Sequence, residues 1–346
     1  MALRINEHDS DIESKFQRYL ISRGASSLER LNVIRDKVSI TPTFDRIFQS
    51  TKKQIATEST HVTDRLKDMF HRKKVVMDEL DAHTRRIFVK GLISPSGPFC
   101  FLDLGCLPGG FALSIKLKNR SATGMGISLS PDCGGNPSLL YTSPRFSLCY
   151  ANVNDVPDEL TNRNCQLPYD RRAYDLVIAD VQFLDINMIQ SDGGRDQKTI
   201  HQRRLVLSQL AIALSAVCSG GTLLVKLSHA EDVVTAQLLH MLDSLSVSFT
   251  TYKPRAIYQH RAPFYAIAQG IKDDVRQKFL PHLHSLRCQL LEKRDRPLHH
   301  TDLDFAITYD ELLEEHNLTK YLAWATPVWE AQAKALEAKL IRWRAN

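Results

Sequence analysis

Two side chains suited to proton transfer follow strand-like segments of the chain. Asp180 lies in the apolar run Tyr174–Val181, and Lys226 lies near the end of the run Gly221–Leu227. A carboxylate can orient a lysine amine, and a lysine can accept a proton when burial or neighbouring cations lower its pKa. The carboxyl ends of parallel strands meet at the ligand-binding edge of a sheet. The two residues are candidates for a catalytic pair, although each alone could be an ordinary strand-end residue.

A glycine-rich turn follows another apolar run. The segment Phe99–Ala112 reads FCFLDLGCLPGGFA, so a strand would end near Gly105 and a helix would begin near Gly110. Glycines permit a close approach of ligand to backbone, and the first turn of a helix offers free N–H groups. The spacing differs from the Gly-x-Gly-x-x-Gly dinucleotide fingerprint, and no Gly-Lys-Ser/Thr follows as in a P-loop. The turn therefore favours a nucleotide-like ligand other than NAD or ATP.

These candidates need a sheet that brings their segments together. Short apolar runs alternate with helix-like segments such as 197–218 and 231–245. The runs are Phe99–Cys106, Ala122–Leu129, Phe146–Val153, Tyr174–Val181, Gly221–Leu227, Val247–Tyr252 and Phe264–Ile271. Buried strands that alternate with helices indicate an α/β fold with a doubly wound sheet. We expect this core at 97–271, between helical extensions at 1–96 and 272–346.

Several motifs of this core resemble those of one enzyme family, in the same order. They are the glycine turn Phe101–Phe111, then Gly124–Leu129, Tyr174–Asp180, Gly220–Leu227, Lys253-Pro254 and Phe264-Tyr265. Over about 97–271 the chain resembles the FtsJ-like (RrmJ-type) S-adenosylmethionine-dependent RNA 2′-O-methyltransferases. The resemblance implies a Rossmann-like methyltransferase core with a mostly parallel seven-stranded sheet. It also implies S-adenosyl-L-methionine as cofactor and methyl transfer to a ribose 2′-hydroxyl of RNA, hence RNA as a partner.

The resemblance assigns roles to individual residues. Cofactor contacts are expected from Asp103, Gly105, Cys106, Leu107, Pro108, Gly109, Gly110, Phe111, Ser128, Asn152, Val153 and Asp180. Catalysis in the family uses a Lys-Asp-Lys-Glu tetrad, and Asp180 and Lys226 match its middle positions. For the first lysine we take Lys74, with Lys73 and Lys90 as rivals; the alternative for all three is a solvated basic helix face. No metal site is expected.

The fourth tetrad position departs from the family pattern. Pro263 stands where the glutamate is expected, and a proline side chain can neither ionise nor form a hydrogen bond. Glu231 could replace that glutamate, although its position is also typical of a helix start. Two alternatives to RNA methylation therefore stay open. One is a catalytically impaired FtsJ-like domain that binds cofactor or RNA; the other is a methyltransferase that has moved to a small-molecule acceptor.

Charge and composition set further expectations. The chain has 346 residues and a formal net charge of +6, and residues 51–90 hold ten Lys and Arg against six Asp and Glu. This basic stretch suits RNA phosphates, but equally a solvated surface. In the C-terminal extension, Thr326-Pro327 is typical of a helix start.

The location of the protein is inferred from what the sequence lacks. We find no apolar run of the roughly 20 residues that a membrane helix needs, and no apolar core of a signal peptide near residue 1. The seven cysteines are scattered and form no Cys-x-x-Cys pair, which fits a reducing compartment. We therefore expect an intracellular protein, cytoplasmic or nuclear and not secreted, without membrane association; its oligomeric state stays open.

Overall fold

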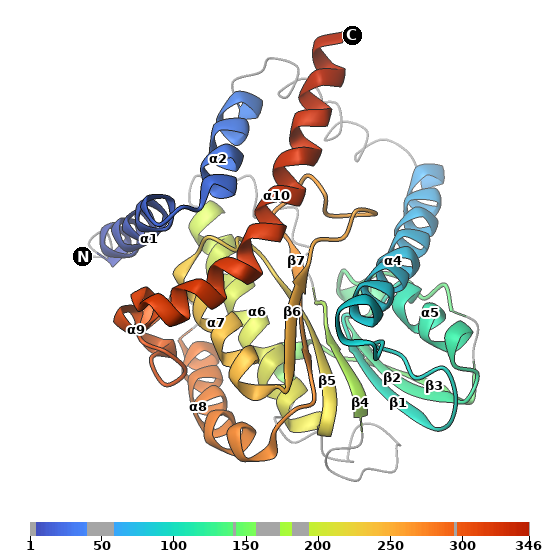
Figure 1. The fold of residues 1–346 in the computed structure, drawn as a ribbon. Coiled ribbons are helices and arrows are strands. Elements are labelled where there is room, and N and C mark those ends of the chain that lie inside the picture. Colours follow the sequence, from blue (N-terminus) through green and yellow to red (C-terminus); the bar gives the residue numbers. More distant parts are fainter. Residues whose placement is uncertain are drawn as a thin grey trace.

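A seven-stranded sheet forms the centre of the structure (Figure 1), a computed structural model that describes residues 5–39, 59–140, 143–156, 174–181, 194–293 and 296–345. The strands are β1 (Phe99–Leu104), β2 (Ala122–Ser128), β3 (Phe146–Tyr150), β4 (Tyr174–Ala179), β5 (Val217–Leu227), β6 (Ser248–Tyr252) and β7 (Phe264–Gln269). Their order is β3-β2-β1-β4-β5-β7-β6. Only β7 runs against its neighbours β5 and β6. The expected strands and the mostly parallel sheet are thus confirmed.

Helices cover both faces of this sheet (Figure 1). They are α1 (Ile5–Ser22), α2 (Ser26–Ser39), α4 (Ser59–Phe88), α5 (Gly110–Lys118), α6 (Gly194–Ala216), α7 (Val233–Leu245), α8 (Asp273–Glu292), α9 (Tyr309–Leu313) and α10 (Glu315–Ala345). Short 3-10 turns lie at Pro131–Cys133, Val153–Asp155 and His300–Leu303. The helical extensions expected at both ends are therefore present.

Alternate residues of the central strands enter two different cores, because side chains of a strand point to opposite faces. In β1, Phe101 packs with residues of α4 and α5 on one face of the sheet. Leu102 and Leu104 pack on the other face, in a core shared with α6, α7, α8 and α10. The Rossmann-like α/β core is therefore a three-layer arrangement, and the extensions contribute to both helical layers.

Two expected boundaries were wrong. The helix expected to run to Cys218 ends at Ala216, because the β-branched Val217 already pairs with Tyr174 of β4. The last helix does not start at Thr326-Pro327: α10 begins at Glu315 and continues through Pro327. Proline inside a helix removes one backbone hydrogen bond and bends the helix, and Figure 1 shows α10 changing direction along its length.

The first part of the basic stretch lies outside the described residues. Residues 51–58, with Lys52 and Lys53, are among those not described, whereas α4 carries most of the remaining basic residues. None of the described helices combines the length and apolar character of a membrane span.

Candidate active site

The carboxyl ends of three neighbouring strands bring the candidate residues together. β4 lies between β1 and β5 in the sheet. Asp180 follows β4 directly and its backbone N–H donates to the carbonyl of Leu104 in β1, at 3.0 Å. Lys226 is the penultimate residue of β5, on the other side of β4. The sheet thus places Asp180 between the glycine turn that follows β1 and the lysine at the end of β5.

The carboxylate of Asp180 is the centre of a buried polar cluster. Lys226 Nζ lies 2.8 Å from its Oδ1 and also donates to the Asp180 carbonyl at 2.9 Å. Tyr265 donates its hydroxyl to the same Oδ1 at 2.9 Å. The ammonium group of Lys73 pairs with Oδ2. The side chains of Lys73, Lys226 and Asp180 are 9%, 10% and 1% exposed, so these charges interact with little screening by water.

Burial and charge act in opposite directions on this cluster. Burial alone would raise the pKa of Asp180, but the ammonium groups of Lys226 and Lys73 lower it below its usual value. Burial alone would lower the pKa of Lys73, but the Asp180 carboxylate raises it above its usual value. Burial and the same carboxylate raise the pKa of Tyr265 well above its usual value. Asp180 is therefore ionised at neutral pH, Lys73 is protonated and Tyr265 is neutral.

The lysine at Asp180 is Lys73, which the sequence had offered as a rival, and not Lys74. Consecutive residues of a helix point in different directions, and Lys74 pairs instead with Asp78 on α4, at 2.8 Å. Lys90 is exposed beyond the end of α4. The ammonium group of Lys73 also lies 4.9 Å from the centre of the Phe111 ring. Lys74 and Lys90 thus lie outside the Asp180 cluster.

Close packing of α4 on the glycine turn explains why Lys73, and not Lys74, pairs with Asp180. A Cβ atom at Gly110 would lie only 2.3 Å from the carbonyl oxygen of Phe70 in α4. The absence of a side chain therefore allows α4 to cross directly over the start of α5, with Lys73 one turn along.

At the fourth tetrad position the structure places backbone instead of a carboxylate. Pro263 immediately precedes β7, and its carbonyl accepts a hydrogen bond from Lys253 Nζ at 3.0 Å. Glu231 is committed elsewhere: its oxygens bind Arg35 Nη1 at 2.6 Å and Trp329 Nε1 at 3.2 Å. Glu231 therefore joins the helical extensions to the core rather than the Asp180 cluster.

Tyr265 was not among the site residues expected from the sequence. Its signal is the strand register, since β5 and β7 are antiparallel and Lys226 is paired directly with Tyr265. Residues paired across two strands point to the same face of the sheet. If the last apolar run had been assumed to pair antiparallel with the run that contains Lys226, the sequence would have identified Tyr265.

The glycine turn has the geometry of a close ligand approach. Gly105 and Gly109 have φ angles of +83° and +114°, which glycine adopts at least cost. A Cβ at Gly105 would lie 2.7 Å from Cα of Val181, so the turn also packs tightly on the segment after β4. Gly109 caps the N-terminus of α5, whose first amides can bind an anionic group such as a carboxylate.

Asp103 provides a test of the cofactor that the resemblance implies. Both carboxyl oxygens are buried and have no hydrogen-bond partner among the described residues. Burial and the nearby Asp180 carboxylate raise the pKa of Asp103 to about 8. A buried carboxyl group of this kind is stabilised by a cation or a hydrogen-bond donor. S-adenosylmethionine carries both an ammonium and a sulfonium group, so the residues at this turn fit it.

The other expected cofactor residues lie at strand ends or in the turn. Ser128 ends β2, and Asn152 and Val153 follow β3, so that the ends of β1, β2 and β3 lie in a row. The Asn152 side chain is exposed and accepts from the Asn154 amide at 3.1 Å. Cys106, Leu107, Pro108 and Phe111 are buried in the turn and the start of α5. Their contacts with the cofactor stay a prediction.

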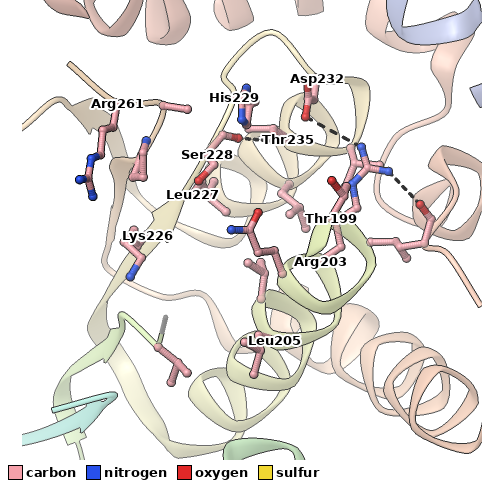
Figure 2. A pocket seen from close by; sticks show the side chains of 18 of the residues that line it. Thr199, Arg203, Leu205, Lys226, Leu227, Ser228, His229, Asp232, Thr235 and Arg261 are labelled. Carbon is pink, nitrogen blue, oxygen red and sulfur yellow. Dashed lines mark hydrogen bonds and ion pairs between the residues drawn. The ribbon is translucent and has the colours of Figure 1, made fainter. Parts of the chain in front are cut away.

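A cavity of about 650 Å³ opens beside Lys226 (Figure 2). It is lined by the end of β5, the N-terminal half of α6, the start of α7 and the loop between β6 and β7. Its basic side chains are Lys226, Arg203, His229 and Arg261. Arg203 is paired with Glu13 at 3.2 Å, whereas Arg261 is exposed. The cavity can therefore receive an anionic molecule next to the Asp180 cluster.

Comparison with solved structures gives distant likenesses. A protein from Plasmodium falciparum described as a ribosomal RNA methyltransferase is 19% identical, with 58% of this chain and 97% of that chain covered and a TM-score of 0.40. Human methyltransferase-like protein 13, solved with S-adenosylhomocysteine, is 14% identical, with coverages of 68% and 94% and a TM-score of 0.37. A Streptococcus thermophilus rRNA methylase is 11% identical, with coverages of 52% and 90% and a TM-score of 0.31. Because these identities and TM-scores are low, the likenesses support no conclusion about the activity of this chain.

A comparison with protein-family models shows the family to which the chain belongs. A search of curated proteins gave no match. The family model described as FtsJ-like methyltransferase matches residues 77–271, which is more than half of the chain. Members of this family use S-adenosylmethionine as cofactor, and the match includes the glycine turn, Asp180, Lys226 and Tyr265. The chain therefore belongs to the FtsJ-like family of S-adenosylmethionine-dependent methyltransferases.

Proposed function

We propose that this methyltransferase acts on a ribose 2′-hydroxyl of RNA. The observation that carries the proposal is the Asp180 cluster, in which one buried carboxylate binds Lys73, Lys226 and Tyr265. The cluster lies between the glycine turn and a cavity whose lining holds four basic side chains and one acidic side chain, Asp232. A nucleotide with its phosphate groups matches that lining better than a neutral acceptor does.

Proton removal is the task of the protein in this reaction, because a ribose hydroxyl is a weak acid and a poor nucleophile. S-adenosylmethionine, when bound, supplies a methyl group on a positively charged sulfur. Lys226 borders the cavity, and in its neutral amine form it is placed to take the proton of the acceptor hydroxyl and become an ammonium group. Asp180 orients the Lys226 amine, at 2.8 Å. Lys73 and Tyr265 bind the same carboxylate, so Asp180 divides its charge among three partners.

Lys73 has a second effect on the same step. Once Lys226 has taken the proton, two ammonium groups face a single carboxylate, so this part of the site has an excess of positive charge. Positive charge in a buried site stabilises the negative charge that develops on the acceptor oxygen. Lys73 itself stays protonated, since the Asp180 carboxylate raises its pKa despite its burial. The two lysines thus have different roles: Lys226 moves the proton and Lys73 supplies charge.

The absence of a glutamate at position 263 favours slow methyl transfer. It also supports the alternative that the protein is catalytically impaired. Pro263 offers only a backbone carbonyl, which Lys253 already engages. A site that lacks the fourth charged group could retain the cofactor and RNA without efficient methyl transfer. The alternative function is therefore a catalytically impaired FtsJ-like protein that binds cofactor and RNA.

Methyl transfer from tritiated S-adenosylmethionine tests the proposal. Purified protein is incubated with total RNA and with capped RNA, the RNA is digested to nucleosides, and 2′-O-methylated nucleosides are identified by mass spectrometry. We expect label in ribose-methylated nucleosides, and none with an Asp180→Asn protein. Cofactor binding in calorimetry without transfer to any RNA would support the impaired alternative. Label on a base, or on a small molecule from a cell extract, would contradict the proposed acceptor.

The extent of the catalytic core and the location of the protein are also proposals. We propose that the catalytic core corresponds to 97–271, with 1–96 and 272–346 as extensions, although Lys73 in α4 belongs to the catalytic cluster. We also propose an intracellular location, where RNA and S-adenosylmethionine are both present and scattered cysteines stay reduced.

A further inference from the structure

The loop between β6 and β7 is fastened to helix α10, which lies outside the part of the chain that matches the family. Lys253 Nζ bonds to the carbonyls of Arg261 and Pro263 in this loop and reaches Gln332 Oε1 of α10 at 3.4 Å. One turn further along α10, the His260 ring lies beside the backbone of Ala335. Arg261 and Pro263 line the cavity at Lys226, so this loop connects α10 with the cavity.

Two basic residues continue along the face of α10 that meets the loop. Lys339 and Arg342 follow Ala335 by four and seven residues, the spacing that keeps side chains on one face of a helix. Burial and the nearby Arg261 lower the pKa of Lys339. Burial and the nearby Lys339 likewise lower the pKa of His260, with Arg342 and Arg261 adding to the effect. We name His260, Arg261, Lys339 and Arg342 the basic rim.

The basic rim lacks the acidic partners that other parts of α10 have. Within the described part of the chain, no salt bridge involves Arg261, Lys339 or Arg342. The side of α10 that faces α2 is neutralised instead, since Arg30 and Glu337 form an ion pair there. Like charges held together without an acid repel each other, and a bound anion removes that repulsion.

We propose that the basic rim binds the phosphate backbone of single-stranded RNA next to the nucleotide that occupies the cavity. Arg261 belongs to both the cavity lining and the rim, so the two surfaces are continuous. Lys339 lies over the Trp343 ring, 4.7 Å from its centre, which adds an aromatic surface beside the phosphate contacts. This inference rests on the proposed function and adds to it a substrate-binding role for the C-terminal extension.

The test compares two protein variants that each lose two positive charges. The rim variant is Lys339→Ala with Arg342→Ala, and the control is Lys278→Ala with Lys334→Ala, two exposed lysines outside the rim. Binding of a fluorescein-labelled single-stranded RNA is followed by anisotropy at several KCl concentrations. Each phosphate contact to a single strand contributes about 0.7 to the slope of log affinity against log salt, so the rim variant should lose about 1.4. Its affinity should fall by roughly tenfold, whereas the control should match the wild type.

Further measurements separate this inference from the proposed function. Thermal unfolding and calorimetry with S-adenosylmethionine should give wild-type values for both variants, because Lys339 and Arg342 lie on α10 and not in the glycine turn. If the wild type binds and methylates RNA and the rim variant keeps the full salt slope, the rim inference is wrong while the function stands. If the wild type neither binds nor methylates RNA, both fail. Binding to phosphatidylserine vesicles is measured as well. If the rim variant binds these vesicles less than the wild type but binds RNA equally well, the inference is also overturned.

Discussion

At the scale of single residues, Asp180 decides what its neighbours can do. Its carboxylate is 1% exposed and binds two ammonium groups and one phenol. Removing a partner from a buried ion pair leaves an uncompensated charge and costs several kcal/mol, on the order of 3–5. Substitutions in this cluster must therefore be assessed for folding as well as for activity.

Substitution of Lys73 and of its neighbour should have different effects on methyl transfer. Lys73→Ala leaves Lys226 as the single cation that pairs with Asp180 among the described residues, so the positive charge that stabilises the acceptor oxygen is reduced. We expect the rate to fall by about 10²-fold, the lower range for loss of a positioned catalytic group. Lys74→Ala removes only an ion pair with Asp78 and should stay near the wild-type rate. The reverse order would show that the described arrangement of α4 is not the active one.

Substitution of Lys226 separates an enzyme from a binding protein. Lys226→Ala should slow methyl transfer by about 10²–10⁴-fold and leave the affinity for S-adenosylmethionine unchanged, because the lysine borders the acceptor cavity. Lys226→Arg should restore little, since a guanidinium group stays protonated. Single-turnover rates and calorimetry measure the two effects. Equal rates for wild type and Lys226→Ala would contradict a role in proton transfer.

The sequence could identify Asp180 and Lys226 but could not choose between Lys73 and Lys74. Strand-end residues are placed by the apolar runs alone, because each run ends at the same edge of the sheet. A lysine on a helix of 30 residues is placed by the rotation of that helix, and one residue changes its direction by about 100°. That rotation depends on the contact between Phe70 and Gly110, which no local pattern reveals.

At the scale of elements, tight junctions between strand and helix position the site. All seven strands were predicted from their apolar runs, which are buried on both faces in β1, β4 and β7. The junction of α6 with β5 and the start of α10 were not, because Val217 pairs with the distant Tyr174 of β4 and because α10 continues through Pro327 against the local preference of proline. We expect cofactor binding to depend on the glycines of the turn after β1.

Gly109→Ala should weaken cofactor binding strongly. The residue has a φ of +114°, and an added Cβ would lie 2.4 Å from Cγ of Leu140, so the turn or the Leu140 side chain must shift. Gly97→Ala is the matched control, because Gly97 has a φ of +77° with no atom near the added Cβ. Both variants carry backbone strain, but only Gly109→Ala should lose most of the binding heat of S-adenosylmethionine. Equal losses would indicate a general effect on folding, and retained affinity in Gly109→Ala would contradict the site at this turn.

At the scale of the whole molecule, the extensions are joined to the core by buried polar contacts. Glu231, just before α7, binds Arg35 of α2 and Trp329 of α10. Lys253 at the end of β6 binds Gln332 of α10. α2 and α10 also lie side by side (Figure 1). These contacts predict that the extensions and the core unfold together, so that a change at Glu231 alters the stability of the whole chain.

The pH dependence of stability tests this coupling. Burial alone would raise the pKa of Glu231, but hydrogen bonding to His229 and the Arg35 charge lower it to about 2 from an ordinary value of 4.5. A carboxylate with a lowered pKa stabilises the fold above its unfolded pKa, and the effect disappears as pH falls toward the folded pKa. At neutral pH the shift corresponds to about 3 kcal/mol, and this part is lost between about pH 5 and pH 2.

Urea unfolding at a series of pH values measures the effect, with Glu231→Gln compared with the wild type. At neutral pH we expect Glu231→Gln to lower the free energy of unfolding by about 3 kcal/mol, in one cooperative transition. The difference between the two proteins should shrink steadily below about pH 5, because protonation of Glu231 makes the wild type resemble the variant. Glu337→Gln is the control: its pair with Arg30 is largely exposed, so the change should stay within about 1 kcal/mol. A constant difference from pH 7 to pH 3 would show that Glu231 contributes through packing and not through its charge, and two separate transitions would show that the extensions fold independently of the core.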